Sequence, residues 1–145
     1  LMEWGFLARS LAFGSQAEAE EAIVIATRNL GISPDHPCAW LWQLFQGIAC
    51  MNLERYAEAR TWLEHVVTAS ADFARGWMCL ASARGALGDV EGARAAAARA
   101  SAINAGLTPA RFVGYVTVMA GDADASARIT RGIADAHLLD DGSGR

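Results

Sequence analysis

The sequence predicts an all-α protein, an α-α superhelix of about four antiparallel helix pairs that forms one domain over residues 1–138. Three observations predict this fold. Alanine, leucine and arginine dominate the composition while β-branched residues are sparse, which favours helices over strands. Apolar residues make up 53% of the 145-residue chain, so it can bury a continuous core. A short motif also recurs at a fixed spacing, as in stacked repeats.

The recurring motif places alanine at equivalent positions of two segments. Tyr-Ala-Glu-Ala-Arg at 56–60 aligns with Val-Glu-Gly-Ala-Arg at 90–94, and Ala59 and Ala93 are 34 residues apart. A large side chain at these positions would hold the two helices of a pair apart, so a small residue is expected there. The period indicates helix pairs that stack in a row.

The spacing resembles that of the tetratricopeptide repeat, whose signature is W-x2-L-G-x2-Y, then A-x3-F, then P. Trp77 and Ala81 match the first part of the signature in one unit, and Gly47 matches its small position in the unit before. Gln43 and Gln46 stand where that earlier unit would have tryptophan and leucine. The closing prolines are also missing, so the repeats are degenerate.

The repeat predicts eight helices in chain order. We expect four helix pairs, at 2–30, 38–69, 73–103 and 109–138. Their helices are expected at about 2–13 and 17–30 in the first pair, 38–51 and 55–69 in the second, 73–86 and 90–103 in the third, and 109–119 and 123–138 in the fourth. A polar tail at 139–145 is expected to be disordered. Capping residues support the starts, since Asp89, Thr108 before Pro109, and Asp122 each precede a predicted helix. We expect Gly31, Asn52 and Gly106 to end helices. Asn52 is expected to adopt a left-handed conformation there.

The first helix of each pair in such a stack lines the inner, concave face, and the second helices form the outer face. The repeat's spacing therefore predicts an apolar inner surface. The expected partner-binding residues are Trp4, Leu7, Leu11, Leu41, Leu44, Ile48, Met51, Arg75, Met78, Ser82, Phe112, Val116 and Met119.

Composition excludes several classes of partner and compartment. The net charge is -4, which argues against nucleic acid, and the absence of lysine excludes Schiff-base and phosphate-loop chemistry. No apolar run of membrane-spanning length or secretory leader is found. Because Cys38, Cys50 and Cys79 are odd in number and form no C-x-x-C pair, we expect a reducing, cytoplasmic location.

Residue patterns for catalysis, metals and cofactors are missing from the sequence. His36, His65 and His137 are scattered and have no carboxylate or cysteine at ligand spacing, and no nucleophile elbow occurs. We therefore expect no enzyme, no metal and no cofactor. Four tryptophans fall at helical spacing and are expected in the core, namely Trp40, Trp42, Trp62 and Trp77.

A further resemblance rests on five runs of sequence at 36–42, 47–49, 54–59, 106–108 and 131–136. Together they resemble the carboxy-terminal tetratricopeptide region of bacterial class III adenylate cyclases, a region that also accompanies winged-helix transcriptional regulators. The resemblance implies a regulatory part of a larger signalling protein. It transfers no catalytic residue, because its motifs are packing motifs.

Three functions remain open from the sequence. The leading hypothesis is a protein-interaction module whose apolar groove accepts a helix or extended segment, from a partner or from another domain of the parent protein. An inner face filled by the chain's own last helix would count heavily against it. The alternatives are a homodimerising scaffold and a sensor of a small apolar or aromatic ligand, for which Arg75 and Ser82 are the convergent polar groups.

Overall fold

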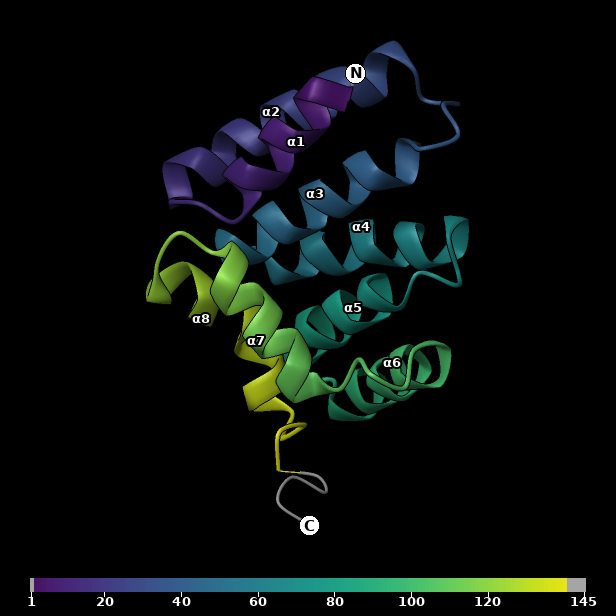
Figure 1. Ribbon diagram of the computed structural model, residues 1–145, viewed down its shortest axis with the longest axis vertical. Coiled ribbons are helices and arrows are strands. Elements are labelled where there is room, and N and C mark those ends of the chain that lie inside the picture. The colour runs from purple at the N-terminus through teal and green to yellow at the C-terminus, as the bar shows by residue number, and fades with distance from the viewer. Residues whose placement is uncertain (1, 141–145) are drawn as a thin grey trace.

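The computed structural model describes residues 2–140, without the side chains of residues 2–4 and 6 (Figure 1). This part of the chain is all-helical, without strands, and contains eight helices. The all-α prediction is therefore confirmed. The helices are α1 (Met2–Ala12), α2 (Gln16–Ile32), α3 (Ala39–Asn52), α4 (Tyr56–Ala69), α5 (Ala74–Ala86), α6 (Val90–Ile103), α7 (Pro109–Met119) and α8 (Ala123–Asp135).

Helices α1 to α6 form three antiparallel pairs that stack in a row. Each helix packs against the next one in the chain, and Figure 1 shows the pairs as successive layers from the purple end to the teal and green end. The first helices of the pairs also contact one another, α1 with α3 and α3 with α5. This arrangement is the superhelical row of neighbouring pairs that the 34-residue spacing predicts.

Small residues lie where paired helices cross. Ala59 and Ala93, the two equivalent alanines of the motif, are both fully buried. A Cβ added at Gly47 in α3 would lie 2.8 Å from two side-chain carbons of Leu63 in α4, closer than real Cβ contacts. The absence of a side chain at this position therefore allows α3 and α4 to approach closely.

The helix starts follow the predicted capping chemistry. Side-chain oxygens of three N-cap residues accept hydrogen bonds from backbone N–H groups three residues further on, over 2.8 to 3.2 Å: Asp89 from Gly92, Thr108 from Arg111, and Asp122 from Ala125. Ser15 adds a capping box with Glu18 at the start of α2, which the sequence analysis did not identify. Each bond satisfies one of the N–H groups that a helix start leaves unpaired.

The helix ends differ from the prediction. The expectation of a left-handed Asn52 is wrong, because Asn52 is the last helical residue of α3 and Glu54 has the positive φ of 60°. Gly31 lies inside α2, and α6 ends before Gly106 is reached. At the end of α8, His137 has a φ of 55° and ends the helix earlier than predicted.

The fourth pair does not continue the row. Helix α7 packs against α8 and α5, and it lacks the extensive contact with α6 that would match the packing of α3 on α2 and of α5 on α4. Helix α8 packs mainly on α5, and also on α3. Figure 1 shows the α7–α8 hairpin crossing the ends of α3 and α5 steeply. The hairpin thus folds back over the first helices of the preceding pairs.

The predicted tail falls mostly outside the described residues. Of positions 139–145, the structure describes only Leu139, which packs partly buried against the core, and the exposed Asp140.

Candidate functional site

The backbone of α8 lies directly on α5 at two glycines. A Cβ at Gly132 would overlap the carbonyl of Ser82, and a Cβ at Gly85 would overlap the carbonyl of Gly132. The hydroxyl of Ser82 is fully buried and donates a 2.7 Å hydrogen bond to the carbonyl oxygen of Ile129. Ser82, which the sequence suggested as a polar group for a ligand, is therefore used to bind the chain's own last helix.

Asn52 joins three helices where α8 meets the row. Its buried Nδ2 donates to the carbonyl oxygens of Ala12, at 3.0 Å, and Gly14, at 2.8 Å. The Nε of Arg128 in α8 donates to Oδ1 of Asn52 at 3.0 Å and to its carbonyl oxygen at 2.7 Å. One amide therefore pairs carbonyls at the end of α1 and orients a cation from α8.

A second set of contacts fastens α8 to the turn between α3 and α4. The hydroxyl of Tyr56 donates to the carbonyl oxygen of Arg128 at 2.7 Å, and burial raises the pKa of this phenol above its ordinary value. Arg131 forms a 2.8 Å ion pair with Glu54 and lies 5.9 Å from the centroid of the Tyr56 ring. Because the ion pair is exposed, most of the fastening comes from the phenol and from Asn52.

The other end of the hairpin reaches α1. The ring of Tyr115 in α7 meets Phe13 edge to face, with centroids 6.3 Å apart, and the N–H of Gly121 donates to the carbonyl oxygen of Phe13 at 3.0 Å. The hairpin therefore spans from α5 to the end of α1. It covers one end of the inner face of the row and leaves a hollow beside it.

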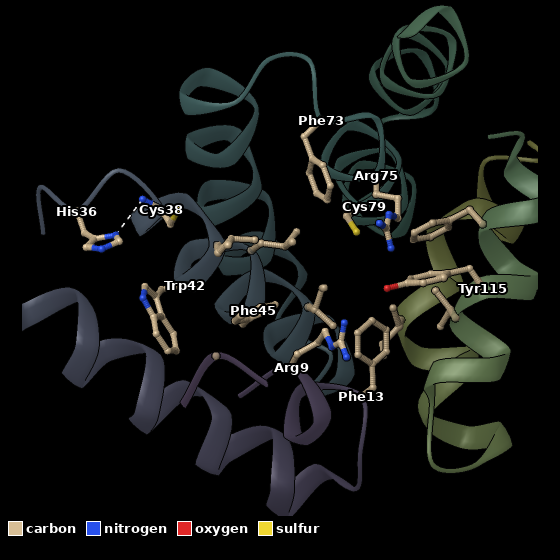
Figure 2. Close-up of a pocket in the computed structure, with 17 residues that line it drawn as sticks. Arg9, Phe13, His36, Cys38, Trp42, Phe45, Phe73, Arg75, Cys79 and Tyr115 are labelled. Carbon is tan, nitrogen blue, oxygen red and sulfur yellow. Dashed lines mark hydrogen bonds between the residues drawn. The ribbon is translucent and has the colours of Figure 1, made fainter. Parts of the chain in front are cut away.

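A cavity of about 550 Å³ remains between the row and the hairpin (Figure 2). Six residues of the predicted inner face line it, namely Leu41, Leu44, Ile48, Arg75, Phe112 and Val116. The repeat spacing does not identify the other eleven lining residues, which are Gly5, Arg9, Phe13, His36, Cys38, Trp42, Phe45, Phe73, Cys79, Tyr115 and Ile129. The walls are thus mainly aliphatic and aromatic, which is typical of small-molecule pockets.

The remaining predicted residues lie elsewhere. Leu11, Met51, Met78 and Ser82 are buried among the helices and do not line the cavity. Met119 is half-buried, and Leu7 is exposed at 41%. The side chain of Trp4 lies outside the described residues. The structure therefore brings about half of the predicted face together around one space.

The polar side chains of the cavity include two arginines and a phenol. Arg75 lies with its guanidinium carbon 5.6 Å from the centroid of Phe73 and 4.8 Å from that of Tyr115. Figure 2 shows Arg75 entering from α5, Arg9 from α1, and the hydroxyl of Tyr115 pointing into the space from α7. Among the lining residues that the structure describes, none is Asp or Glu.

The thiols offer little nucleophilic chemistry. Cys79 lines the cavity and Cys50 lies in the core, and burial raises the pKa of each thiol to about 12. Both thiols are therefore protonated at neutral pH, whereas thiolate is the nucleophilic form. Cys38 is exposed at the rim, where its N–H donates to Nδ1 of His36 at 3.0 Å.

Within the described residues 2–140, no group of three or more histidine, cysteine or acidic side chains lies close enough together to hold a metal ion. No described helix combines the length and the apolar character needed to cross a membrane.

Comparison of the sequence with models of known protein families gives no match. Comparison with curated proteins gives no match either.

Proposed function

We propose that the chain is a regulatory module of helical repeats that binds a small, largely apolar ligand between its row of helix pairs and its last hairpin. The observation that carries this proposal is the partly open cavity of about 550 Å³ with aromatic and aliphatic walls. Pockets for small organic ligands span roughly 300 to 1,000 Å³ and combine apolar walls with a few polar groups. The cavity has both properties.

The docked hairpin counts against the leading hypothesis from the sequence. A partner helix could occupy the part of the inner face that α8 covers only by displacing α8, whose Ile129 and Ile133 are fully buried. Displacing them would expose two apolar side chains, at a cost of about 1.5 to 3 kcal/mol each. A ligand that enters the existing cavity avoids this cost, so the small-ligand alternative has the stronger support.

The regulatory role rests on the resemblance of the sequence to the carboxy-terminal tetratricopeptide region of bacterial adenylate cyclases. In this proposal the chain is the sensory part of such a signalling protein or of a transcriptional regulator. A ligand that contacts both the row and α7 binds best when the hairpin is closed, so its binding shifts the population toward the closed arrangement. A neighbouring domain that contacts the hairpin would respond to that shift.

Titration with the neutral fluorescent dye Nile red tests the proposal. Ile48 lines the cavity and is 4% exposed, so Ile48→Trp should fill part of the space and weaken dye binding by about tenfold or more. Val24, on α2, is 66% exposed, and Val24→Trp is the matched control that adds the same ring outside the cavity. Equal dye binding by the wild type and a folded Ile48→Trp variant would contradict the proposal.

A further inference from the structure

The guanidinium of Arg75 is held at the cavity wall by rings and not by carboxylates. Phe73 and Tyr115 lie on either side of it, with centroids 5.6 and 4.8 Å from the guanidinium carbon. Contact with a ring face orients a guanidinium but leaves its N–H donors in the plane available. Arg75 forms no ion pair or hydrogen bond with the described residues. Its donors are therefore open to the cavity.

The hydroxyl of Tyr115 provides a neutral donor beside this cation. It makes no hydrogen bond within residues 2–140, although the phenol is only partly exposed. Figure 2 shows it pointing into the cavity next to Arg75. A planar cationic fork with an adjacent O–H donor suits the two oxygens of a carboxylate.

The rest of the pocket favours a single anionic group on an apolar body. The described lining contains no carboxylate that would neutralise Arg75. Beyond these groups the walls are chiefly Leu44, Ile48 and Phe112. Such walls offer few partners for a sugar or for several phosphates, whose desolvation would remain uncompensated.

We infer that the ligand is a small monocarboxylic acid with an aromatic or aliphatic body. Its carboxylate binds Arg75 and the hydroxyl of Tyr115, and its apolar part lies against Ile48 and Phe112. This inference rests on the proposed function, because it names the class of ligand for the same cavity. Because Arg75 is exposed, the directed hydrogen bonds from its planar guanidinium contribute more to this contact than the charge attraction, which water screens.

Isothermal titration of the full chain with naphthylacetic acid and with naphthylacetamide tests the inference, because the two molecules differ in charge but hardly in shape. The acid should bind at least tenfold more tightly than the amide. Arg75→Gln should weaken binding of the acid by about 10- to 100-fold, the range for hydrogen bonds to charged groups, and leave binding of the amide unchanged. Tyr115→Phe should weaken binding of the acid by about 3- to 10-fold.

Arg99→Gln is the matched control. Arg99 also lies over a ring, with its guanidinium carbon 5.8 Å from the centroid of Trp77, but it does not line the cavity. This variant should bind both molecules like the wild type. Circular dichroism and thermal unfolding of each variant establish that its fold is intact.

The outcomes separate the ligand class from the proposed function. If acid and amide bind equally to the wild type, or if Arg75→Gln weakens both to the same extent, the inferred carboxylate site is wrong while the apolar pocket remains. Binding of Nile red without any binding of the acid overturns the inference in the same way. Failure of the acid, the amide and the dye to bind would overturn the proposed function as well.

Discussion

Substitution of Gly132 by alanine tests the docking of α8 on α5. The added Cβ would overlap the carbonyl group of Ser82 and would lie 2.6 Å from the backbone nitrogen of Ala86. These are backbone atoms of a well-packed helix, so no side-chain rotation can make room. The two helices would have to separate along their contact.

The expected loss of stability lies between the cost of overpacking this contact, which sets the lower limit, and the cost of undocking α8, which sets the upper limit. Overpacking a tight contact costs about 1 to 3 kcal/mol, from which the higher helix propensity of alanine recovers about 0.5 to 1 kcal/mol. If α8 undocks instead, the fully buried Ile129 and Ile133 become exposed, at about 1.5 to 3 kcal/mol each. Undocking therefore sets the upper limit at about 3 to 6 kcal/mol. We expect a loss of about 3 kcal/mol.

Urea unfolding measures the loss, and amide hydrogen exchange locates it. For a domain of about this size, 3 kcal/mol corresponds to a decrease in Tm of roughly 6 to 12 °C. The matched control is Gly114→Ala in α7, because a Cβ at Gly114 meets nothing within 4 Å, and this variant should be as stable as the wild type or slightly more stable. If Gly132→Ala unfolds like Gly114→Ala, with unchanged exchange in α8, the reasoning about this contact is wrong.

Three further predictions concern the contacts of Ser82 and Asn52 near α8 and the two buried thiols. Ser82→Ala removes the 2.7 Å hydrogen bond from this hydroxyl to a carbonyl oxygen of α8, so urea unfolding should show a free energy of unfolding lower by about 0.5 to 1.5 kcal/mol. Adding Ala83→Ser to this variant should not restore the lost stability. Asn52→Ala leaves two carbonyls at the end of α1 without their buried donor, so it should cost about 2 to 4 kcal/mol and speed amide exchange there. Burial raises the pKa of the Cys50 and Cys79 thiols from 9.0 to about 12, so the unfolded chain ionises first. The contribution of the two protonated thiols to the free energy of unfolding is fully present below pH 9. It should decline by at most about 1.4 kcal/mol per pH unit for each thiol as the pH rises toward 12. Urea unfolding of a variant with alanine at both positions should lack this decline.

Local chemistry explains why the helices themselves were predictable. The residues that start α6, α7 and α8 carry side-chain oxygens that accept from the first backbone N–H groups, and this signal needs no tertiary context. Ala59 and Ala93 mark the crossing points because only a small residue fits there, whatever the neighbouring repeat contains. Both kinds of signal are present in a short window of sequence.

The helix ends were less predictable because the residue types at these positions do not mark them. The left-handed positions after α3 and α8 are occupied by Glu54 and His137, not by glycine. In each turn a backbone N–H then donates a hydrogen bond to a carbonyl oxygen of the preceding helix, from Arg55 to Cys50 and from Leu138 to Ile133. These bonds and the burial of Leu138 offset the conformational cost of the positive φ.

The cavity was only partly predictable for a related reason. Repeat spacing identifies residues on the first helices, so Leu44, Ile48 and Arg75 could be assigned to the inner side. Arg9 and Tyr115 complete the site only because the hairpin folds back toward α1. The glycines that permit this, Gly85 and Gly132, are 47 residues apart and outside the repeat's period, so no local pattern links them.

In the proposed function, docking of the hairpin and binding of a ligand share one equilibrium. Asn52, Tyr56 and Ser82, whose contacts hold α8, do not line the cavity, so a ligand there would add contacts to α7 without replacing any of theirs. A ligand that binds only the docked state stabilises it by about 2.7 kcal/mol at 100 times its Kd. This equals most of the loss expected for Gly132→Ala. Occupancy of the cavity can therefore decide whether a weakened hairpin stays docked, which is the property that a sensory module needs.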